Sequence, residues 1–167
     1  MSQGRDTRAS RIVVGMAAGE ALAYGSRLVE ALHEAGDEVH LVMTREAERA
    51  LGDDLERVRS LATQVYASGN QAARISSGSF LTRGMIVVPC DGAALAAISL
   101  GLATNLVFRA ADVTLKEQRP LVLGLTTSAP SSIEQEQLAR AADVPGLVTF
   151  PLEGSPDDAV AELLGQL

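Results

Sequence analysis

The sequence has few of the residues that build disulfides, metal centres and nucleic-acid surfaces. Its 167 residues include one cysteine, two histidines and no tryptophan, and aromatic residues make up 3%. A single cysteine excludes an internal disulfide and a cysteine-rich zinc site, and two histidines leave little for a histidine-based metal centre. The scarcity of aromatic side chains also argues against a surface on which nucleic-acid bases stack.

Positive charge and long apolar runs are scarce too. The chain carries 14 basic against 21 acidic residues, a formal net charge of −7. Nucleic acids and anionic membranes gain affinity mostly from cationic side chains, so we expect neither as a partner. The longest uncharged stretch, Gly92–Phe108, has 17 residues and is interrupted by Gly, Ser, Thr and Asn. It falls short of the ~20 apolar residues of a spanning helix, and we expect a cytoplasmic protein.

The length fits one domain of about 150 residues. Residues 1–10 are polar and predict a flexible N-terminal tail, and residues 11–167 predict a single domain. Strands are predicted at residues 11–15, 38–43, 64–67, 84–89, 121–125 and 146–150, and helices at 21–35, 45–62, 91–101, 105–117, 133–142 and 156–167. This alternation predicts an α/β three-layer sandwich with a mainly parallel sheet.

Ligands of open parallel sheets bind beyond the carboxyl ends of the strands, near a switch in strand order. The segments that follow predicted strands are therefore candidates for a site: residues 16–20, 44–45, 90–94 and 126–130. The polar connection over residues 68–83 is unusually long, and such a segment is either functional or mobile. Within it, Ser76–Phe80 either closes over a ligand or forms a polar surface loop.

Two runs of sequence, Ile75–Cys90 (ISSGSFLTRGMIVVPC) and Asn105–Leu123 (NLVFRAADVTLKEQRPLVL), resemble the flavin prenyltransferase family of UbiX/Pad type, within the flavoprotein superfamily. The order of elements also fits over roughly residues 11–150. The resemblance implies a Rossmann-like (flavodoxin-like) protomer in a trimer or dodecamer, with flavin mononucleotide (FMN) at the protomer interface. The implied reaction joins a dimethylallyl group from a prenyl phosphate to reduced flavin, at N5 and then C6. The product serves as the prenylated cofactor of a partner decarboxylase.

Two basic residues match the family's positions near the prenyl phosphate. They are Arg109 and Lys116, and Lys116 is the only lysine of the chain. Arginine can hold a departing phosphate in bidentate fashion, while lysine supplies a point charge or a proton. The alternative is a solvated helix face, on which this pair forms ion pairs with Asp112 or Glu117.

The first loop departs from the family's Gly-Ala-Ser-Gly. The aligned residues here are Ala18, Gly19, Glu20 and Ala21, so that Glu20 replaces a serine that lies against the flavin. A carboxylate there either acts as a base or hydrogen-bond acceptor, or blocks the flavin. Asp54 stands near an acidic position of the family and joins Glu20 among the catalytic candidates.

The later loops depart as well. Where the family has Ser and Thr that bind the flavin phosphate, this chain has Asp91, Gly92, Ala93 and Ala94. A helix N-terminus there still offers backbone N–H groups to an anion, whereas the Asp91 carboxylate repels a phosphate; its alternative role is an ordinary N-cap.

Thr44 and Thr126 complete the cofactor-binding candidates, since each directly follows a predicted strand. Thr126 and Thr127 replace an Arg-Glu pair of the family, and Ser128 adds a third hydroxyl. The family's C-terminal tyrosine and basic residue have no counterpart in residues 151–167.

These departures leave a second function open: a non-prenylating homologue that keeps the oligomeric fold as a flavin-binding, other ligand-binding or structural subunit. A third, a flavin-dependent decarboxylase of a cysteine-like carboxylate, needs a histidine near the flavin. His40 is predicted within a strand and His33 on an exposed helix face, so neither suits that role. Cys90 is predicted as a buried thiol, and the stretch 93–103 as a subunit contact.

Overall fold

The computed structural model describes residues 10–127 and 129–167. The expected tail lies outside these residues except for Ser10, and so does Ser128. The strands are β1 (Arg11–Met16), β2 (Glu38–Met43), β3 (Gln64–Ala67), β4 (Gly84–Cys90), β5 (Leu121–Leu125) and β6 (Leu147–Pro151). The α-helices are α2 (Leu22–Glu34), α3 (Arg45–Leu51), α4 (Leu55–Leu61), α5 (Gly92–Ser99), α6 (Leu106–Lys116), α7 (Ser132–Ala142) and α8 (Pro156–Gly165).

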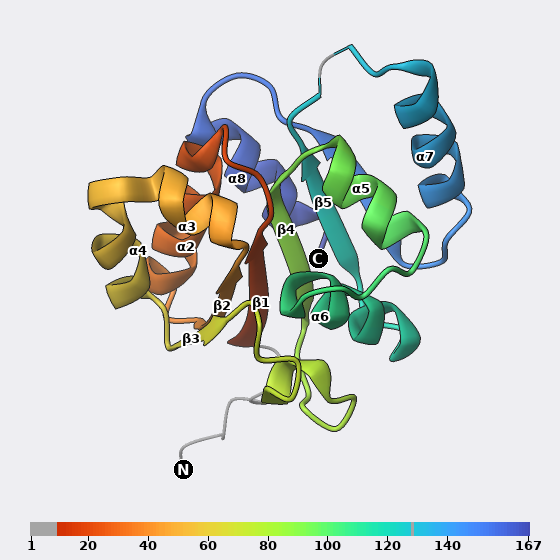
Figure 1. Ribbon diagram of the computed structural model, residues 1–167. Helices are drawn as coiled ribbons and strands as arrows, with labels where there is room; N and C mark the ends of the chain where they lie inside the picture. Colours follow the sequence, from red (N-terminus) through yellow and green to blue (C-terminus); the bar gives the residue numbers. More distant parts are fainter. Residues whose placement is uncertain (1–9, 128) are drawn as a thin grey trace.

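The six strands form one sheet in the order β3-β2-β1-β4-β5-β6, and every pair is parallel (Figure 1). The predicted α/β three-layer architecture is confirmed, and the order is that of a flavodoxin-like doubly wound sheet. The chain reverses its direction of travel across the sheet between β1 and β4. The carboxyl ends of these two central strands are therefore where a ligand of this fold binds.

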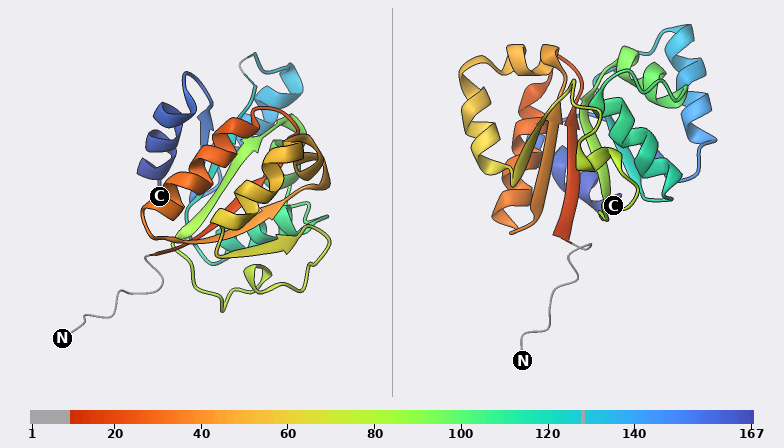
Figure 2. Two further views of the ribbon diagram at one scale, coloured as in Figure 1. Left: turned by 90° about the vertical axis from the view of Figure 1, so that its left-hand side faces the viewer. Right: turned by 60° about the horizontal axis from the view of Figure 1, so that its bottom comes forward.

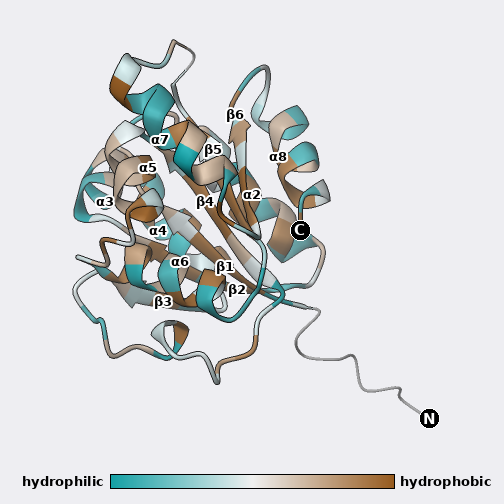
Figure 3. Ribbon diagram, turned by 90° about the vertical axis from the view of Figure 1, so that its right-hand side faces the viewer, coloured by the Kyte–Doolittle hydropathy of each residue, from teal (hydrophilic) through white to brown (hydrophobic). Residues whose placement is uncertain are grey.

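Helices cover both faces of the sheet (Figure 2). Side chains of α2, α3, α4 and α8 pack on one face around Ile12, Val14 and Ile86. Side chains of α5, α6 and α7 pack on the other face around Val13 and Val87. The central strands β1, β4 and β5 are apolar over nearly all their length because both of their faces are buried, and Figure 3 shows brown in the middle of the sheet. The edge strands β3 and β6 are partly exposed.

The prediction of a single charged helix over residues 45–62 is wrong. The structure has two helices there, α3 and α4, which are separated by a short 3-10 turn, Gly52–Asp54. Gly52 has φ 54°, in the left-handed region that favours glycine, so the chain turns there instead of continuing as one helix. Thr44 caps α3: its hydroxyl accepts a hydrogen bond from Ala47 N at 3.2 Å.

The long connection between β3 and β4 is held against the amino-terminal side of the sheet. It contains a 3-10 turn, Arg74–Ser76, and the ring of Phe80 meets the His40 ring at a centroid distance of 5.0 Å. Arg119 donates hydrogen bonds to the carbonyls of Gly78 and Phe80, at 2.7 and 2.9 Å. Ser76–Phe80 thus lies away from the carboxyl ends of its own chain's central strands.

The described residues hold neither a membrane-spanning helix nor a cluster of metal ligands. No helix among the described residues is long and apolar enough to cross a membrane. In the same part of the chain, no group of three or more His, Cys, Asp or Glu side chains is arranged to hold a metal ion.

Candidate functional site

Four loops meet at the carboxyl ends of the strands, at the top of Figure 1. Thr44 N donates to Met16 O at 2.9 Å, Ala17 N donates to Pro89 O at 3.0 Å, and Thr126 N donates to Cys90 O at 3.1 Å. These bonds join the ends of β2, β1, β4 and β5 in the order of the sheet. All the candidate cofactor-binding residues therefore come together, although they span residues 18–126.

The loop after β1 is made of small residues apart from Glu20, and its last residue has a left-handed backbone conformation. Ala18 is fully buried, whereas Glu20 is exposed. Ala21 has φ 53°, a conformation that costs an L-residue other than glycine about 1–2 kcal/mol. It precedes α2, whose N-terminus has no side-chain cap and no acidic residue in its first turn. The start of α2 therefore presents uncapped backbone N–H groups at this edge of the sheet.

The loop after β4 begins α5. Asp91 is an N-cap, and its Oδ1 accepts a hydrogen bond from Ala94 N at 2.9 Å. Gly92 and Ala93 form the first turn, and Ala94 is buried against the sheet. Cys90 is fully buried, and burial raises the pKa of its thiol, so this cysteine is not a nucleophile.

A residue that the sequence analysis missed enters the site from α7. The Glu134 side chain lies beside Gly92, and its Oε1 accepts a hydrogen bond from the Thr127 hydroxyl at 3.2 Å. Its Oε2 accepts one from Ser131 N at 2.7 Å, within a capping box at the start of α7. The spacing of Ser131 and Glu134 predicts only a helix start, and nothing in the local sequence shows that this helix packs against α5.

The candidates for prenyl phosphate binding lie on α6. Arg109 is exposed in the second turn, and Lys116, at the last residue, forms an ion pair with Asp112 at 2.6 Å. Lys116 also lines a cavity with residues 144–146, which precede β6 and so lie at the amino end of the sheet. Within one chain, Lys116 and the four loops are therefore at opposite ends of the sheet.

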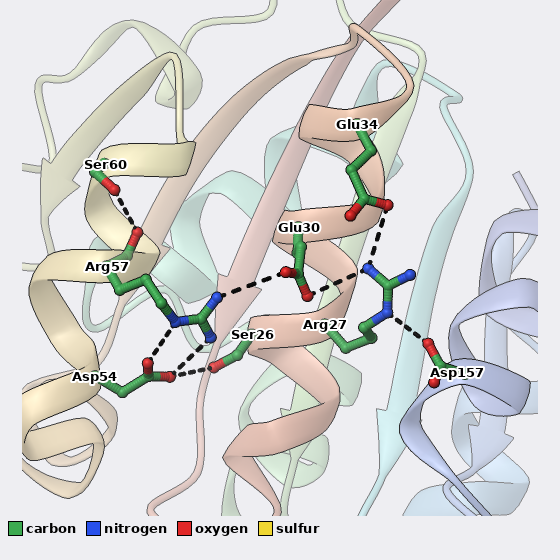
Figure 4. Close-up of polar contacts among 8 residues, drawn as sticks. All are labelled: Ser26, Arg27, Glu30, Glu34, Asp54, Arg57, Ser60 and Asp157. Carbon is green, nitrogen blue, oxygen red and sulfur yellow. Dashed lines mark hydrogen bonds and ion pairs between the residues drawn. The ribbon is translucent and has the colours of Figure 1, made fainter.

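Asp54 lies on the other face of the sheet from α6. It receives two hydrogen bonds from Arg57, at 2.6 and 3.2 Å, and one from the Ser26 hydroxyl at 3.4 Å (Figure 4). The Arg57 guanidinium holds the pKa of the Asp54 carboxyl below its usual value. The same surface continues through Glu30 to Arg27 and Asp157 of α8. The structure thus brings Asp54 to a charged surface between α2, α4 and α8.

His40 and His33 lie where the sequence places them. His40 is 3% exposed, and its Nδ1 is 2.9 Å from the Tyr66 hydroxyl. His33 is exposed near the end of α2. Neither ring is on a loop at the carboxyl ends of the strands, which argues against the decarboxylase hypothesis.

Comparison with known proteins decides the family. The model of the Flavoprotein family matches residues 1–161. The flavin prenyltransferase LpdB of Lactiplantibacillus plantarum is 40% identical over 147 residues, which cover 85% of this chain and 79% of LpdB. The chain belongs to the flavin prenyltransferase group of the Flavoprotein family.

Two other members of this family extend the comparison. A probable UbiX-like flavin prenyltransferase of Bacillus subtilis is 48% identical over 124 residues, 72% of this chain and 60% of the relative. The crystal structure of AnUbiX (PadA1) in complex with FMN and dimethylallyl pyrophosphate has a TM-score of 0.84 and 36% identity, over 95% of this chain and 90% of that one. These comparisons confirm the flavodoxin-like fold and the resemblance of residues 75–90 and 105–123 to the flavin prenyltransferase family.

The loops of this flavoprotein fit a flavin. The buried residues Ala17 and Ala18 and the first turn of α5 carry no bulky side chain of their own at the switch point, where Glu134 of α7 lies beside Gly92. The uncapped start of α2 offers N–H donors for an anion. Thr126 and Thr127 supply hydroxyls from the loop after β5.

Proposed function

We propose that this chain binds FMN at the carboxyl ends of β1, β4 and β5 and transfers a dimethylallyl group to the reduced flavin. The observation that carries the proposal is the convergence of the four loops at the switch point, in a chain 36% identical in sequence to a structure that holds FMN and dimethylallyl pyrophosphate. We assign the flavin to the backbone of residues 17–21, to Gly92 and Ala93, and to the hydroxyls of Thr44 and Thr126.

The transfer needs a cation for the leaving group and groups that accept and deliver protons. The C1–O bond of the donor breaks, and its electron pair leaves with the phosphate. C1 bonds to N5 of the flavin, which loses a proton. In the second step the C2=C3 double bond of the prenyl group takes up a proton at C2, C3 bonds to C6 of the flavin, and C6 gives up its hydrogen as a proton. Arg109 and Lys116 are our candidates for holding the phosphate. Because Lys116 is remote from the loops of its own chain, these side chains would serve the site of a neighbouring copy.

The two acidic candidates, Glu20 and Asp54, have different roles in this proposal. Glu20 is exposed at the loop after β1, where its carboxylate can accept the proton that N5 releases. Asp54 is tied to Arg57 and Ser26 on the α2 face, so any catalytic role also requires a neighbouring copy to bring a site to it.

The alternative is a non-prenylating homologue that keeps the oligomeric fold as a flavin-binding, other ligand-binding or structural subunit. The observation that favours it is at α5, where carboxylates of Asp91 and Glu134 lie at the helix start. A partner decarboxylase would receive the prenylated product under the first function and would have no role under the second.

Two measurements separate these functions. An absorbance spectrum after incubation with FMN and desalting reports flavin binding, and a retained flavin band is expected. The mass of the flavin after anaerobic reduction with dimethylallyl phosphate or pyrophosphate reports transfer. Bound flavin of unchanged mass would favour the alternative, and absence of bound flavin would overturn both flavin-based functions.

A further inference from the structure

The start of α5 carries two carboxylates that reach it from different elements. Asp91, at the end of the β4 loop, accepts a hydrogen bond from Ala94 N. Glu134, from α7, lies against the α-carbon of Gly92, at a place that a Cβ on residue 92 would occupy. The packing of α7 along α5 maintains this approach: the Ser99 hydroxyl donates to Gln137 Oε1 at 2.6 Å.

Glu134 is fixed and charged. Ser131 N and the Thr127 hydroxyl donate to its two oxygens, and these hydrogen bonds hold the pKa of the Glu134 carboxyl below its usual value. No ion pair among the described residues involves Glu134 or Asp91. The negative charge at the start of α5 is therefore not neutralised by a cation of the described chain.

The two helices that begin at the switch point differ in how their N-termini are capped, although a carboxylate also lies near α2, where the Glu46 side chain contacts Gly19. The start of α2 has uncapped N–H groups and no acidic residue in its first turn. At the start of α5, the positive end of the helix dipole is already met by the chain's own carboxylates. A phosphate at α5 would stand within a few Å of two like charges, whereas a hydroxyl or ring N–H would find acceptors.

We propose that Glu134 is a specificity-determining residue of the flavin site: with Asp91 it reserves the start of α5 for an uncharged, hydrogen-bond-donating part of the flavin and disfavours a phosphate there. The substrate class is thereby widened to flavins without a 5′-phosphate, so that riboflavin binds about as well as FMN. This inference rests on the proposed function, since it presupposes flavin binding.

The test compares dissociation constants for FMN and riboflavin, measured by quenching of flavin fluorescence at one ionic strength. Glu134→Gln keeps the shape and the hydrogen-bond acceptor but removes the charge. We expect it to tighten FMN binding about tenfold and to change riboflavin binding less than about threefold. Gly92→Ala, whose Cβ would displace the carboxylate, should move the ratio of the two constants in the same direction.

Ser131→Ala is the matched control, because it removes the N-cap of α7 and leaves the carboxylate. If Glu134 served only to hold α7 in place, Ser131→Ala and Glu134→Gln would change the dissociation constants for FMN and riboflavin by equal factors. That result would overturn this inference and leave the proposed function standing. A wild-type protein that binds FMN at least tenfold more tightly than riboflavin would also overturn it. Failure of every variant to bind either flavin would overturn the proposed function and this inference together.

Discussion

Ala21 has a backbone conformation that favours glycine, the residue that the family has at this position. The family has glycine at this position, and the structure gives a physical reason, since φ is 53°. We expect Ala21→Gly to raise the free energy of unfolding by about 1 kcal/mol. The urea midpoint should rise with an unchanged slope. Ala23→Gly, on the exposed face of α2, is the matched control and should lower stability by about 1 kcal/mol. Equal effects of the two substitutions would contradict the strain at residue 21.

His40 predicts how stability depends on pH. Burial lowers the pKa of His40 in the folded chain, and Arg11 and Arg74 act in the same direction, whereas Glu38 opposes them. As pH falls below about 6.5, the unfolded chain binds a proton that the folded chain does not. The free energy of unfolding should therefore decrease between pH 7 and the lower folded pKa of His40.

The measurement is a urea titration at several pH values between about 7 and 5. His40→Gln should flatten the decrease, whatever its effect on stability at pH 7. His33→Gln, at the exposed histidine of α2, is the matched control for the loss of a histidine. A wild-type curve that is flat across this range would show that the burial of His40 is not maintained in solution.

At the scale of elements, the sequence predicts where strands lie better than it predicts where a helix is broken. The predicted bounds of β2, β3 and β5 agree with the observed bounds, because apolar and β-branched residues recur along each of these segments. The break at Gly52 was missed because the charged pattern on either side of it continues with helical spacing. The four loops were located because they follow strands, whereas Glu134 depends on the contact of α7 with α5, which no local pattern contains.

The connection between β3 and β4 depends on Arg119. Its guanidinium donates to the carbonyls of Gly78 and Phe80 and is mostly buried. We expect Arg119→Ala to lower the free energy of unfolding by about 1–3 kcal/mol, because two carbonyl acceptors lose a charged donor. Hydrogen exchange should become faster over residues 76–82. Arg83→Ala, at an exposed arginine of the same connection, should leave both quantities near wild type. Unchanged exchange in Arg119→Ala would mean that the packing of Phe80 and the hydrogen bond from Arg11 to Leu81 O hold the segment without Arg119.

At the scale of the whole molecule, the separation of Lys116 from the loops bears on assembly. A site that uses the loops of one chain and α6 of another is complete only in an oligomer. The stretch predicted as a subunit contact, residues 93–103, leaves two large apolar side chains exposed in the single chain: Leu100 at 48% and Leu102 at 52%. A neighbouring copy that covers them would remove this apolar surface from water.

Leu102→Asp tests this assembly, because it places a charge in the proposed contact without touching the core. Sedimentation velocity at micromolar concentration should show an oligomer for the wild type and smaller species for Leu102→Asp. Ala161→Asp adds the same charge to the exposed side of α8, on the other face of the sheet, and should sediment as the wild type does. If the dissociated Leu102→Asp still retained FMN but no longer prenylated it, the flavin would depend on the loops of one chain and the phosphate on α6 of the next. A wild type that sediments as a monomer and still transfers the prenyl group would contradict this division.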